Sequence, residues 1–190
     1  MSVPTLMTER LILRNFQEND LEAIFKIFSD EKINTFLPWF PLKTLQEAKE
    51  FYEKNYMNSK GYKYAICLKE ENVPIGYIHV SQEESHDFGY GLLEEYWRKG
   101  IVSEASRAIL EQLKKDGIPF ITATHDMNNP HSGYVMKAIG MKYQYTYQEL
   151  WQPKNKLVYF RMYQLSFVEN QNVYKKYWDM YSTHFIEENI

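Results

Sequence analysis

The residues best able to do chemistry lie in the stretch EEYWRKGIVSEAS, Glu94 to Ser106. A strand is expected to end just before it, at Leu92–Leu93, and a helix to begin directly after Gly100. Backbone N–H groups at a helix N-terminus lack intrahelical partners, and together with the helix dipole they favour an anion such as phosphate. A glycine lets the backbone approach that anion closely, and Arg98 and Lys99 add positive charge. The pattern indicates a phosphate cradle, although a glycine before a helix is more commonly a plain turn.

Strand and helix patterns on both sides of this stretch would hold it in place. Apolar residues recur with period two in the expected strands and with helical spacing in the expected helices. No repeat, low-complexity tract or linker separates them. In chain order the predicted elements are a strand at 9–16, a helix at about 21–28, a second helix after 44, strands at 62–68, 75–80 and about 87–93, a helix at about 101–115, a strand at 118–124, a helix at 129–140 and strands at 141–147 and 157–165.

The composition indicates one soluble domain. The chain has 190 residues, with 44% hydrophobic and 25% charged residues, as is ordinary for a globular domain. A net charge of −3 gives no general attraction to nucleic acid or to an anionic membrane. The first residues lack the pattern of a secretion signal and no apolar run is long enough to span a bilayer, so we expect a cytoplasmic protein. The single cysteine, Cys67, lies in an apolar run and is expected to be buried in a strand.

Residues 168–190 form a tail beyond the predicted domain at 1–167. We expect the tail to be an amphipathic helix that packs on its own domain, and the alternative is a contact between the subunits of a homodimer. The residues that would share one helical face are Val173, Tyr174, Tyr177, Trp178, Tyr181 and Phe185.

Three stretches carry a resemblance to a known family. TERLILRNFQENDLEAIF looks like an opening strand and helix, FGYGLLEEYWRKGIVSEA like a strand with a pyrophosphate loop, and NPHSGYVMKAIGM like a last helix and the turn after it. In this order they resemble the GNAT family of acetyl-CoA-dependent N-acetyltransferases, most closely its RimJ/RimL-like branch, which acetylates protein N-termini and related amines. The resemblance spans about residues 8–165. It implies an α/β (α+β) fold in which helices flank a mixed, mostly antiparallel sheet of about seven strands.

The resemblance implies that acetyl-CoA is the cosubstrate and that no metal takes part. The fixed places of the family loop, Q/R-x-x-G-x-G/A, hold Trp97, Gly100 and Val102 here, and only Gly100 fits. Arg98 stands where the branch usually has another glycine. The strand before the loop is expected to splay from the next one and to direct the N–H near Leu92 toward the thioester oxygen. The residues carried over as acetyl-CoA contacts are Leu92, Leu93, Trp97, Arg98, Lys99, Gly100, Ile101, Val102, Asn129 and Ser132.

Direct acetyl transfer from a thioester to an amine needs a neutral amine, stabilisation of an oxyanion and a proton for the departing thiolate. Many relatives supply that proton from a tyrosine seven residues after an asparagine that contacts coenzyme A. Counted from Asn129, this position is Met136 here, so Ser132 is the first candidate. The alternative role for Ser132 is a helix N-cap. Tyr134, two residues further on, is expected to pack.

A base must accept the amine proton, and the family's acceptor groove lies between the loop that joins its first two helices and its last two strands. Glu149 is the best-placed carboxylate by analogy, with His86 and Asp87 as alternatives. Each of them also fits an ordinary solvated surface group. The aromatic residues of FLPWFPL would wall the groove or, alternatively, anchor the core. The expected substrate contacts are Trp39, Phe40, His86, Asp87 and Trp151.

Other functions find less support in the sequence. No paired cysteines and no H-x-x-x-H spacing support a metal site at His125, Asp126 and His131. A serine hydrolase would need a G-x-S-x-G elbow, which does not occur. The remaining rival is a GNAT-like domain that has lost turnover and serves as a coenzyme A-binding or dimerising module. The acceptor stays open between a protein N-terminus and small amines, because function lies in the groove rather than in the scaffold.

Overall fold

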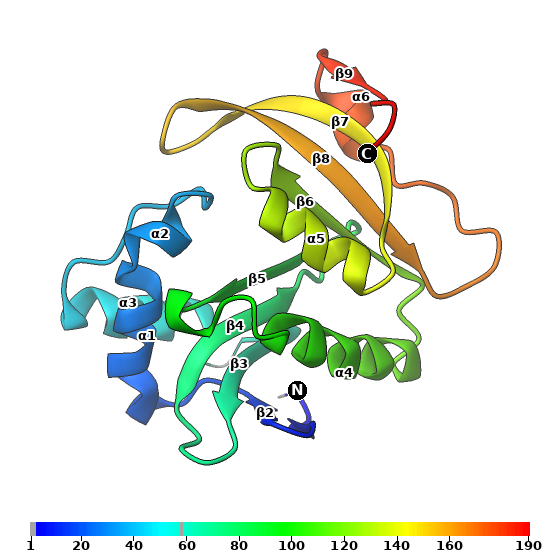
Figure 1. The fold of residues 1–190 in the computed structure, drawn as a ribbon. Helices are drawn as coiled ribbons and strands as arrows, with labels where there is room; N and C mark the ends of the chain where they lie inside the picture. Colours follow the sequence, from blue (N-terminus) through cyan, green and yellow to red (C-terminus); the bar gives the residue numbers. More distant parts are fainter. Residues whose placement is uncertain (1–2, 58) are drawn as a thin grey trace.

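Two antiparallel sheets form the framework of the protein in the computed structural model, which describes residues 3–57 and 59–190 (Figure 1). The first sheet has the order β1-β2-β3-β4-β5, and the second has the order β6-β8-β7-β9. The predicted α/β class with mostly antiparallel strands is confirmed, and its strands are shared between these two sheets. The strands are β1 (Leu6–Met7), β2 (Leu11–Arg14), β3 (Tyr62–Leu68), β4 (Pro74–Val80), β5 (Phe88–Leu92), β6 (Phe120–Asp126), β7 (Lys142–Trp151), β8 (Lys156–Ser166) and β9 (His184–Phe185).

Helices cover both sides of the first sheet (Figure 1), and α5 and the short α6 lie on opposite faces of the second. Helix α1 packs on β4 and on α3, α4 packs on β1 and β2, and α5 packs on β6 and on α4. The short helix α6 packs on β7. The helices are α1 (Leu21–Ser29), α2 (Glu31–Asn34), α3 (Leu45–Asn55), α4 (Ile101–Lys115), α5 (Pro130–Ala138) and α6 (Lys176–Met180).

Helix α4, which has the predicted bounds, begins and ends at glycines with left-handed backbones. Gly100 is its N-cap with a φ of 72°, and Gly117 follows its end with a φ of 76°. Basic residues occupy its last turn, where they complement the helix dipole. Its buried residues recur with helical spacing and fix the helix against the sheet. They are Ile101, Ala105, Ser106, Ile109, Leu110 and Leu113.

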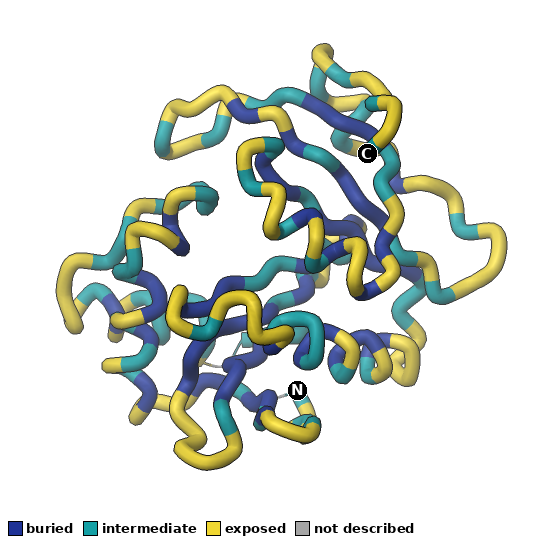
Figure 2. Tube along the Cα trace, viewed as in Figure 1, coloured by how far each residue is buried: buried dark blue, intermediate teal, exposed yellow. Residues whose placement is uncertain are grey.

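Side chains along the first sheet alternate between two cores, so buried segments follow the strands (Figure 2). On β3, Tyr64 and Ile66 face the core that contains α4 and α5, whereas Ala65 and Cys67 face the core that contains α1 and α3. Burial raises the pKa of the Cys67 thiol to about 12. The prediction that Cys67 is a buried strand residue is therefore confirmed.

The two sheets meet where β5 and β6 begin. In the described residues, one parallel bridge joins Asp87 to Thr122, and the Thr122 hydroxyl donates to the Ser85 carbonyl at 2.8 Å. Beyond this bridge β5 pairs with β4 and β6 pairs with β8, so the two strands separate. The splayed strand expected before the glycine loop is confirmed.

The C-terminal tail differs from the expected long helix. Helix α6 is only five residues long, and β9 pairs with the edge of β7. The Gln148 N–H on β7 also donates to the Thr183 carbonyl at 2.9 Å. A helix continued to Phe185 would give up these hydrogen bonds to the sheet edge, which explains why helical spacing of the aromatic residues does not produce a helix here.

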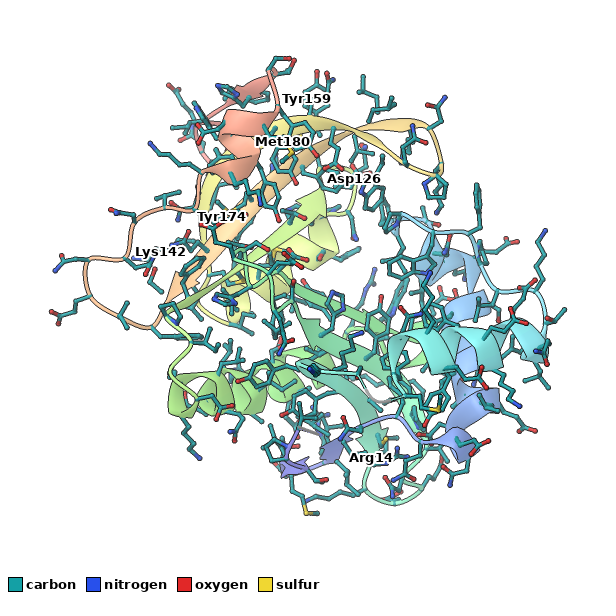
Figure 3. The ribbon with its side chains drawn as sticks, turned by 180° about the vertical axis from the view of Figure 1, so that it is seen from behind. Arg14, Asp126, Lys142, Tyr159, Tyr174 and Met180 are labelled. Carbon is teal, nitrogen blue, oxygen red and sulfur yellow. The ribbon has the colours of Figure 1, made fainter. Side chains whose placement is uncertain are left out.

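The tail packs on the second sheet of the same chain. The Tyr145 hydroxyl donates to the Tyr174 carbonyl at 2.7 Å, and Figure 3 shows Tyr174 and Met180 on the segment that lies over this sheet. Further along, Arg161 Nη2 contacts Glu187 Oε2 at 2.5 Å. Polar contacts therefore hold the tail against the second sheet at Tyr174 and at Glu187. None of the helices in the described ranges is long and apolar enough to cross a membrane.

Candidate functional site

The loop between β5 and α4 presents a row of backbone donors. The Trp97 N–H donates to the Glu94 carbonyl at 2.9 Å, and the Glu104 N–H donates to the Gly100 carbonyl at 3.0 Å. Between them, the N–H groups of residues 98–103 have no hydrogen-bond acceptor within the described part of the chain. Such a run of unpaired donors at a helix N-terminus is suited to the oxygens of a pyrophosphate.

Two positive φ angles shape this loop. Gly100 has a φ of 72° and Arg98 a φ of 60°. An L-residue in this region is strained, which gives a physical reason for the glycine that the resembling branch usually has in place of Arg98. A Cβ added at Gly100 would find its nearest heavy atom, Arg10 Nη2, at 3.8 Å. The positive φ therefore accounts for a glycine at this position, and no neighbouring group of the chain crowds its Cα.

An ion pair from the N-terminal strands holds the loop against α4. Arg10 Nε donates to Glu104 Oε2 at 2.7 Å, and Arg10 Nη1 donates to the Lys99 carbonyl at 3.0 Å. The Thr8 hydroxyl donates to Glu104 Oε1 at 2.5 Å. Burial acts to raise the pKa of Glu104, but these hydrogen bonds outweigh it and lower that pKa. Because Arg10 neutralises Glu104, the exposed Arg98 and Lys99 can give the loop a net positive charge.

The end of β5 turns backbone groups toward the gap between the sheets. The Leu93 N–H donates to the Ile75 carbonyl on β4 at 3.0 Å. Because such bonds involve every second residue of an antiparallel strand, Leu92 directs its N–H away from β4 and toward β6. The Leu92 carbonyl accepts the Trp97 indole N–H at 2.6 Å. The indole N–H of Trp97 is thus engaged by the chain itself, and it fixes the junction between the strand and the loop.

Ser132 meets a tyrosine that the sequence did not single out. The N-cap of α5 is Asn129, so Ser132 lies inside the first turn and the alternative capping role is wrong. The Tyr90 hydroxyl, from β5, lies 2.8 Å from Ser132 Oγ and donates to the Ser132 carbonyl at 2.7 Å. The Asn129 side chain makes no capping hydrogen bond. Tyr134, expected to pack, is 61% exposed.

Two carboxylates border Tyr147, on the face of the second sheet that is turned away from α5. Burial raises the pKa of the Tyr147 hydroxyl, and the nearby charges of Glu149 and Asp87 add to that effect. Burial raises the pKa of Asp87 to about 6. Burial also raises the pKa of Glu149, while a hydrogen bond from the Tyr181 hydroxyl opposes the change. Two of the expected base candidates therefore share one half-buried neighbourhood.

The C-terminal tail supplies aromatic walls to the same neighbourhood. The Tyr177 and Tyr181 rings stack on Tyr147, with centroids 5.2 Å and 5.0 Å away. Burial and the charge of Glu149 raise the pKa of Tyr181 to about 12, so its hydroxyl remains a donor at neutral pH. The sequence predicts only that these tyrosines lie on the apolar face of a tail helix, and nothing in it places them beside Glu149.

The hairpin between β7 and β8 reaches across to α2 (Figure 1). Lys154 Nζ donates to both the backbone carbonyl and the side-chain oxygen of Asn34 at 2.7 Å. Asn34 in turn donates from Nδ2 to the Trp39 carbonyl at 2.7 Å. The Trp39 indole nitrogen is buried without a partner in the described residues, whereas Phe40 is 60% exposed. This bridge lies between the two segments that were expected to border an acceptor groove.

The remaining candidates lie in less suitable surroundings. The His86 ring packs on Phe120 with centroids 5.4 Å apart, and Trp151 packs on Phe160 at 4.9 Å. The Val102 side chain packs partly buried against the main core instead of filling the loop. Leu93 and Ile101 are buried core residues that contribute backbone groups alone. Within the described ranges, no group of three or more His, Cys, Asp or Glu is arranged to hold a metal ion.

Comparison with known proteins identifies the family. Residues 10–142 match the family of the acetyltransferase (GNAT) domain. The chain is 33% identical over 141 residues to the uncharacterized N-acetyltransferase YnaD of Bacillus subtilis. This match covers 72% of this chain and 82% of YnaD.

Solved structures show the same fold. A GNAT-family acetyltransferase from Bacillus anthracis is 27% identical with a TM-score of 0.77, and the match covers 86% of this chain and 98% of that one. The spermidine N-acetyltransferase from Vibrio cholerae, solved with CoA and spermine, is 15% identical with a TM-score of 0.71 over 84% of this chain and 96% of that one. At this identity the second likeness speaks for the fold alone.

Proposed function

Because the chain belongs to the GNAT family of N-acetyltransferases, we propose that it moves an acetyl group from acetyl-CoA directly to a primary amine. The observation that carries the proposal is the row of unpaired N–H groups at residues 98–103, next to the gap that opens between β5 and β6. Phosphate oxygens fit the first feature, and an extended arm that pairs with a free strand edge fits the second.

The residues of the loop would hold coenzyme A mainly through the backbone. The N–H groups of residues 98–103 would bind the pyrophosphate, with Arg98 and Lys99 supplying charge. Trp97 would act indirectly, because its indole N–H already holds the Leu92 carbonyl. Asn129 would contribute its uncapped side chain from the start of α5. When bound, acetyl-CoA supplies an acetyl group activated as a thioester.

The residues around the gap would divide the remaining chemistry. The Leu92 N–H, turned away from β4, would stabilise the negative charge that develops on the carbonyl oxygen. Glu149 or Asp87 would accept the proton of the amine, because a raised carboxylate pKa brings the base closer to neutral pH. Ser132 lies on the other face of the second sheet from these carboxylates, and its hydroxyl would contact the departing sulfur. The stacked tyrosines would keep water away from the base.

The acceptor would be an amine that arrives protonated and is attracted by two carboxylates. Aromatic faces beside a carboxylate also favour cationic groups. A polyamine fits this chemistry, as does a protein N-terminus, and the structurally similar Vibrio cholerae enzyme is named for spermidine. Trp39, Phe40 and Trp151 would border the groove, whereas His86, packed on Phe120, would lie at its closed end.

Release of coenzyme A in the presence of an amine panel tests this function. Spermidine, free amino acids and a peptide with a free N-terminus would be offered to the wild type and to the Glu149→Gln and Asp87→Asn variants. Loss of turnover in one variant, with unchanged acetyl-CoA binding, would identify the base. Glu169→Gln, at an exposed position in the loop after β8, is the matched control. A folded wild type that binds acetyl-CoA but releases no coenzyme A with any amine would support the non-catalytic module instead.

The same reasoning gives a cytoplasmic location and a homodimer as proposals. Acetyl-CoA is an intracellular metabolite, and the net charge of −3 offers no general affinity for nucleic acid or membrane. Apolar side chains stay exposed on the tail, at Met180 and Ile186, where a second subunit would cover them. A strictly monomeric species in sedimentation at high protein concentration would contradict the dimer.

A further inference from the structure

Tyr90 is the only described tyrosine whose hydroxyl contacts Ser132, and the two hydroxyls form a closed arrangement. The Tyr90 oxygen lies 2.7 Å from the Ser132 carbonyl and 2.8 Å from Ser132 Oγ. A tyrosine hydroxyl carries one proton. When that proton is donated to the carbonyl, Ser132 Oγ–H must be the donor of the second bond. The Ser132 hydroxyl proton then points to the Tyr90 oxygen, and the lone pairs of Ser132 Oγ accept no hydrogen bond from Tyr90.

The position of Tyr90 is fixed by the strand that carries it. Glycines flank it on β5, and a Cβ added at Gly89 would lie 2.3 Å from the His79 ring, while one added at Gly91 would lie 2.5 Å from the Tyr77 ring. These close contacts on one face pin the strand against β4. The Tyr90 side chain leaves from the other face, where it packs with the α4 and α5 core. The strand and α5 thus hold the two hydroxyls at hydrogen-bond distance without help from a ligand.

We propose that Tyr90 is a positioning residue that switches the Ser132 hydroxyl between two orientations, and so makes Ser132 a hydrogen-bond donor to the departing coenzyme A sulfur. This inference rests on the proposed acetyl transfer. In the first orientation Tyr90 donates to the Ser132 carbonyl and Ser132 Oγ–H donates to Tyr90, which the two distances allow. In the second, Ser132 donates to the sulfur and the Tyr90 proton turns from the Ser132 carbonyl to Ser132 Oγ. The Tyr90 oxygen is already 2.8 Å from that atom, so no backbone movement is needed.

Neither hydroxyl gives up its proton in this arrangement. Burial raises the pKa of the Tyr90 hydroxyl, and the hydrogen bond to Ser132 offsets this only in part. A thiol is a much stronger acid than a serine hydroxyl and than this buried tyrosine, so the sulfur leaves as a thiolate that accepts a hydrogen bond and later takes its proton from water. A donor that itself accepts a hydrogen bond is a stronger donor, which is the contribution of Tyr90. This replaces the general-acid role expected for Ser132 from the sequence.

The contribution of the sulfur can be measured without turnover. Calorimetric titration with coenzyme A and with desulfo-coenzyme A, which lacks the sulfur, gives an affinity ratio that reports the contact between Ser132 and sulfur. We expect the wild type to prefer coenzyme A by about threefold to tenfold at pH 7, as for one hydrogen bond. The preference should increase at pH 9, where a larger fraction of the coenzyme A thiol is ionised. Tyr90→Phe should lower the ratio and its increase with pH, and Ser132→Ala should abolish both.

The controls separate this inference from the proposed function. Tyr134→Phe, on the exposed face of the same helix, should keep the wild-type ratio. Tyr90→Phe should keep the wild-type affinity for desulfo-coenzyme A, which shows that the variant is folded and that the loop is intact. A Tyr90→Phe ratio equal to that of the wild type, or a Ser132→Ala ratio unchanged from it, would overturn the inference while the acetyltransferase function stands. A folded wild type that binds neither ligand would overturn both.

Discussion

Replacing Gly100 by alanine is expected to cost about 1 kcal/mol, because the loop before α4 needs a left-handed residue at this position. The added Cβ would find Arg10 Nη2 at 3.8 Å, which is an ordinary contact, so no clash contributes. The conformational cost for an L-residue is roughly 1–2 kcal/mol, and alanine recovers about 0.4–1 kcal/mol by restricting the unfolded chain. The net loss is therefore close to 1 kcal/mol.

Gly117→Ala is the matched control at the other end of the same helix. Its φ is 76°, and no heavy atom lies within 4 Å of the added Cβ. The free energy lost from folding and from coenzyme A binding, taken together, should be the same for both variants. For Gly117→Ala the loss should lower the unfolding temperature by about 2–4 °C and leave coenzyme A binding unchanged. For Gly100→Ala the free loop can relax, which transfers part of the loss to coenzyme A binding and weakens it by up to about fivefold.

Thermal unfolding and calorimetric titration with coenzyme A measure the two parts. For Gly100→Ala, the loss of unfolding free energy is added to the loss of binding free energy. We expect this sum to equal the loss of unfolding free energy measured for Gly117→Ala. If Gly100→Ala equals the wild type in both measurements, the left-handed backbone is not required and the reasoning fails. A loss several times larger than that of the control would also refute it, because a steric contact would then dominate.

Three further changes test other parts of the molecule. Asp20→Ala leaves Arg14 buried without the carboxylate that pairs with it at 2.7 Å, so denaturant unfolding should show a loss of about 3 kcal/mol; a midpoint near that of the wild type would show that the pair contributes little. Tyr181→Phe removes a hydrogen bond that lowers the pKa of Glu149, so the acidic limb of the pH–rate profile should move to higher pH; an unmoved limb would point to Asp87 as the base. Asp87 ionises near pH 4 when the chain is unfolded, but its pKa is raised to about 6 when folded, so the stability of the wild type should fall as the pH rises from about 4 to 6. Asp87→Asn should remove this fall. If the unfolding temperature of the variant changes with pH as steeply as that of the wild type, Asp87 does not titrate in this way.

The sequence determined those features that depend on neighbours in the chain. The order of the longer strands and helices, the bounds of α4 and the left-handed glycine before it follow from apolar periodicity and from the position of Gly100. The resemblance carried by three short stretches was enough to identify the GNAT family, which the match over residues 10–142 confirms. Burial of Cys67 also followed from its place in an apolar run.

Local pattern failed where a segment had two ways to satisfy its backbone. The tail has helical spacing of aromatic residues, yet His184–Phe185 pairs with β7 because an open sheet edge was available. Position in the sequence likewise offered a helix-capping role for Ser132, whereas the N-cap of α5 is Asn129. Such competition is decided by what else lies nearby in space, which the linear sequence does not state.

Only the tertiary structure revealed which side chains share a site. Tyr90 and Ser132 are 42 residues apart, and Lys154 and Asn34 are 120 residues apart, yet both pairs are at hydrogen-bond distance. Tyr181 reaches Glu149 because the tail passes over the second sheet. A sequence pattern reports which face of an element is apolar, but the partner of a polar group on that face depends on how the elements pack. For this reason the loop proposed to bind the cofactor could be found from the sequence alone, while the partners of Ser132 and Glu149 could not.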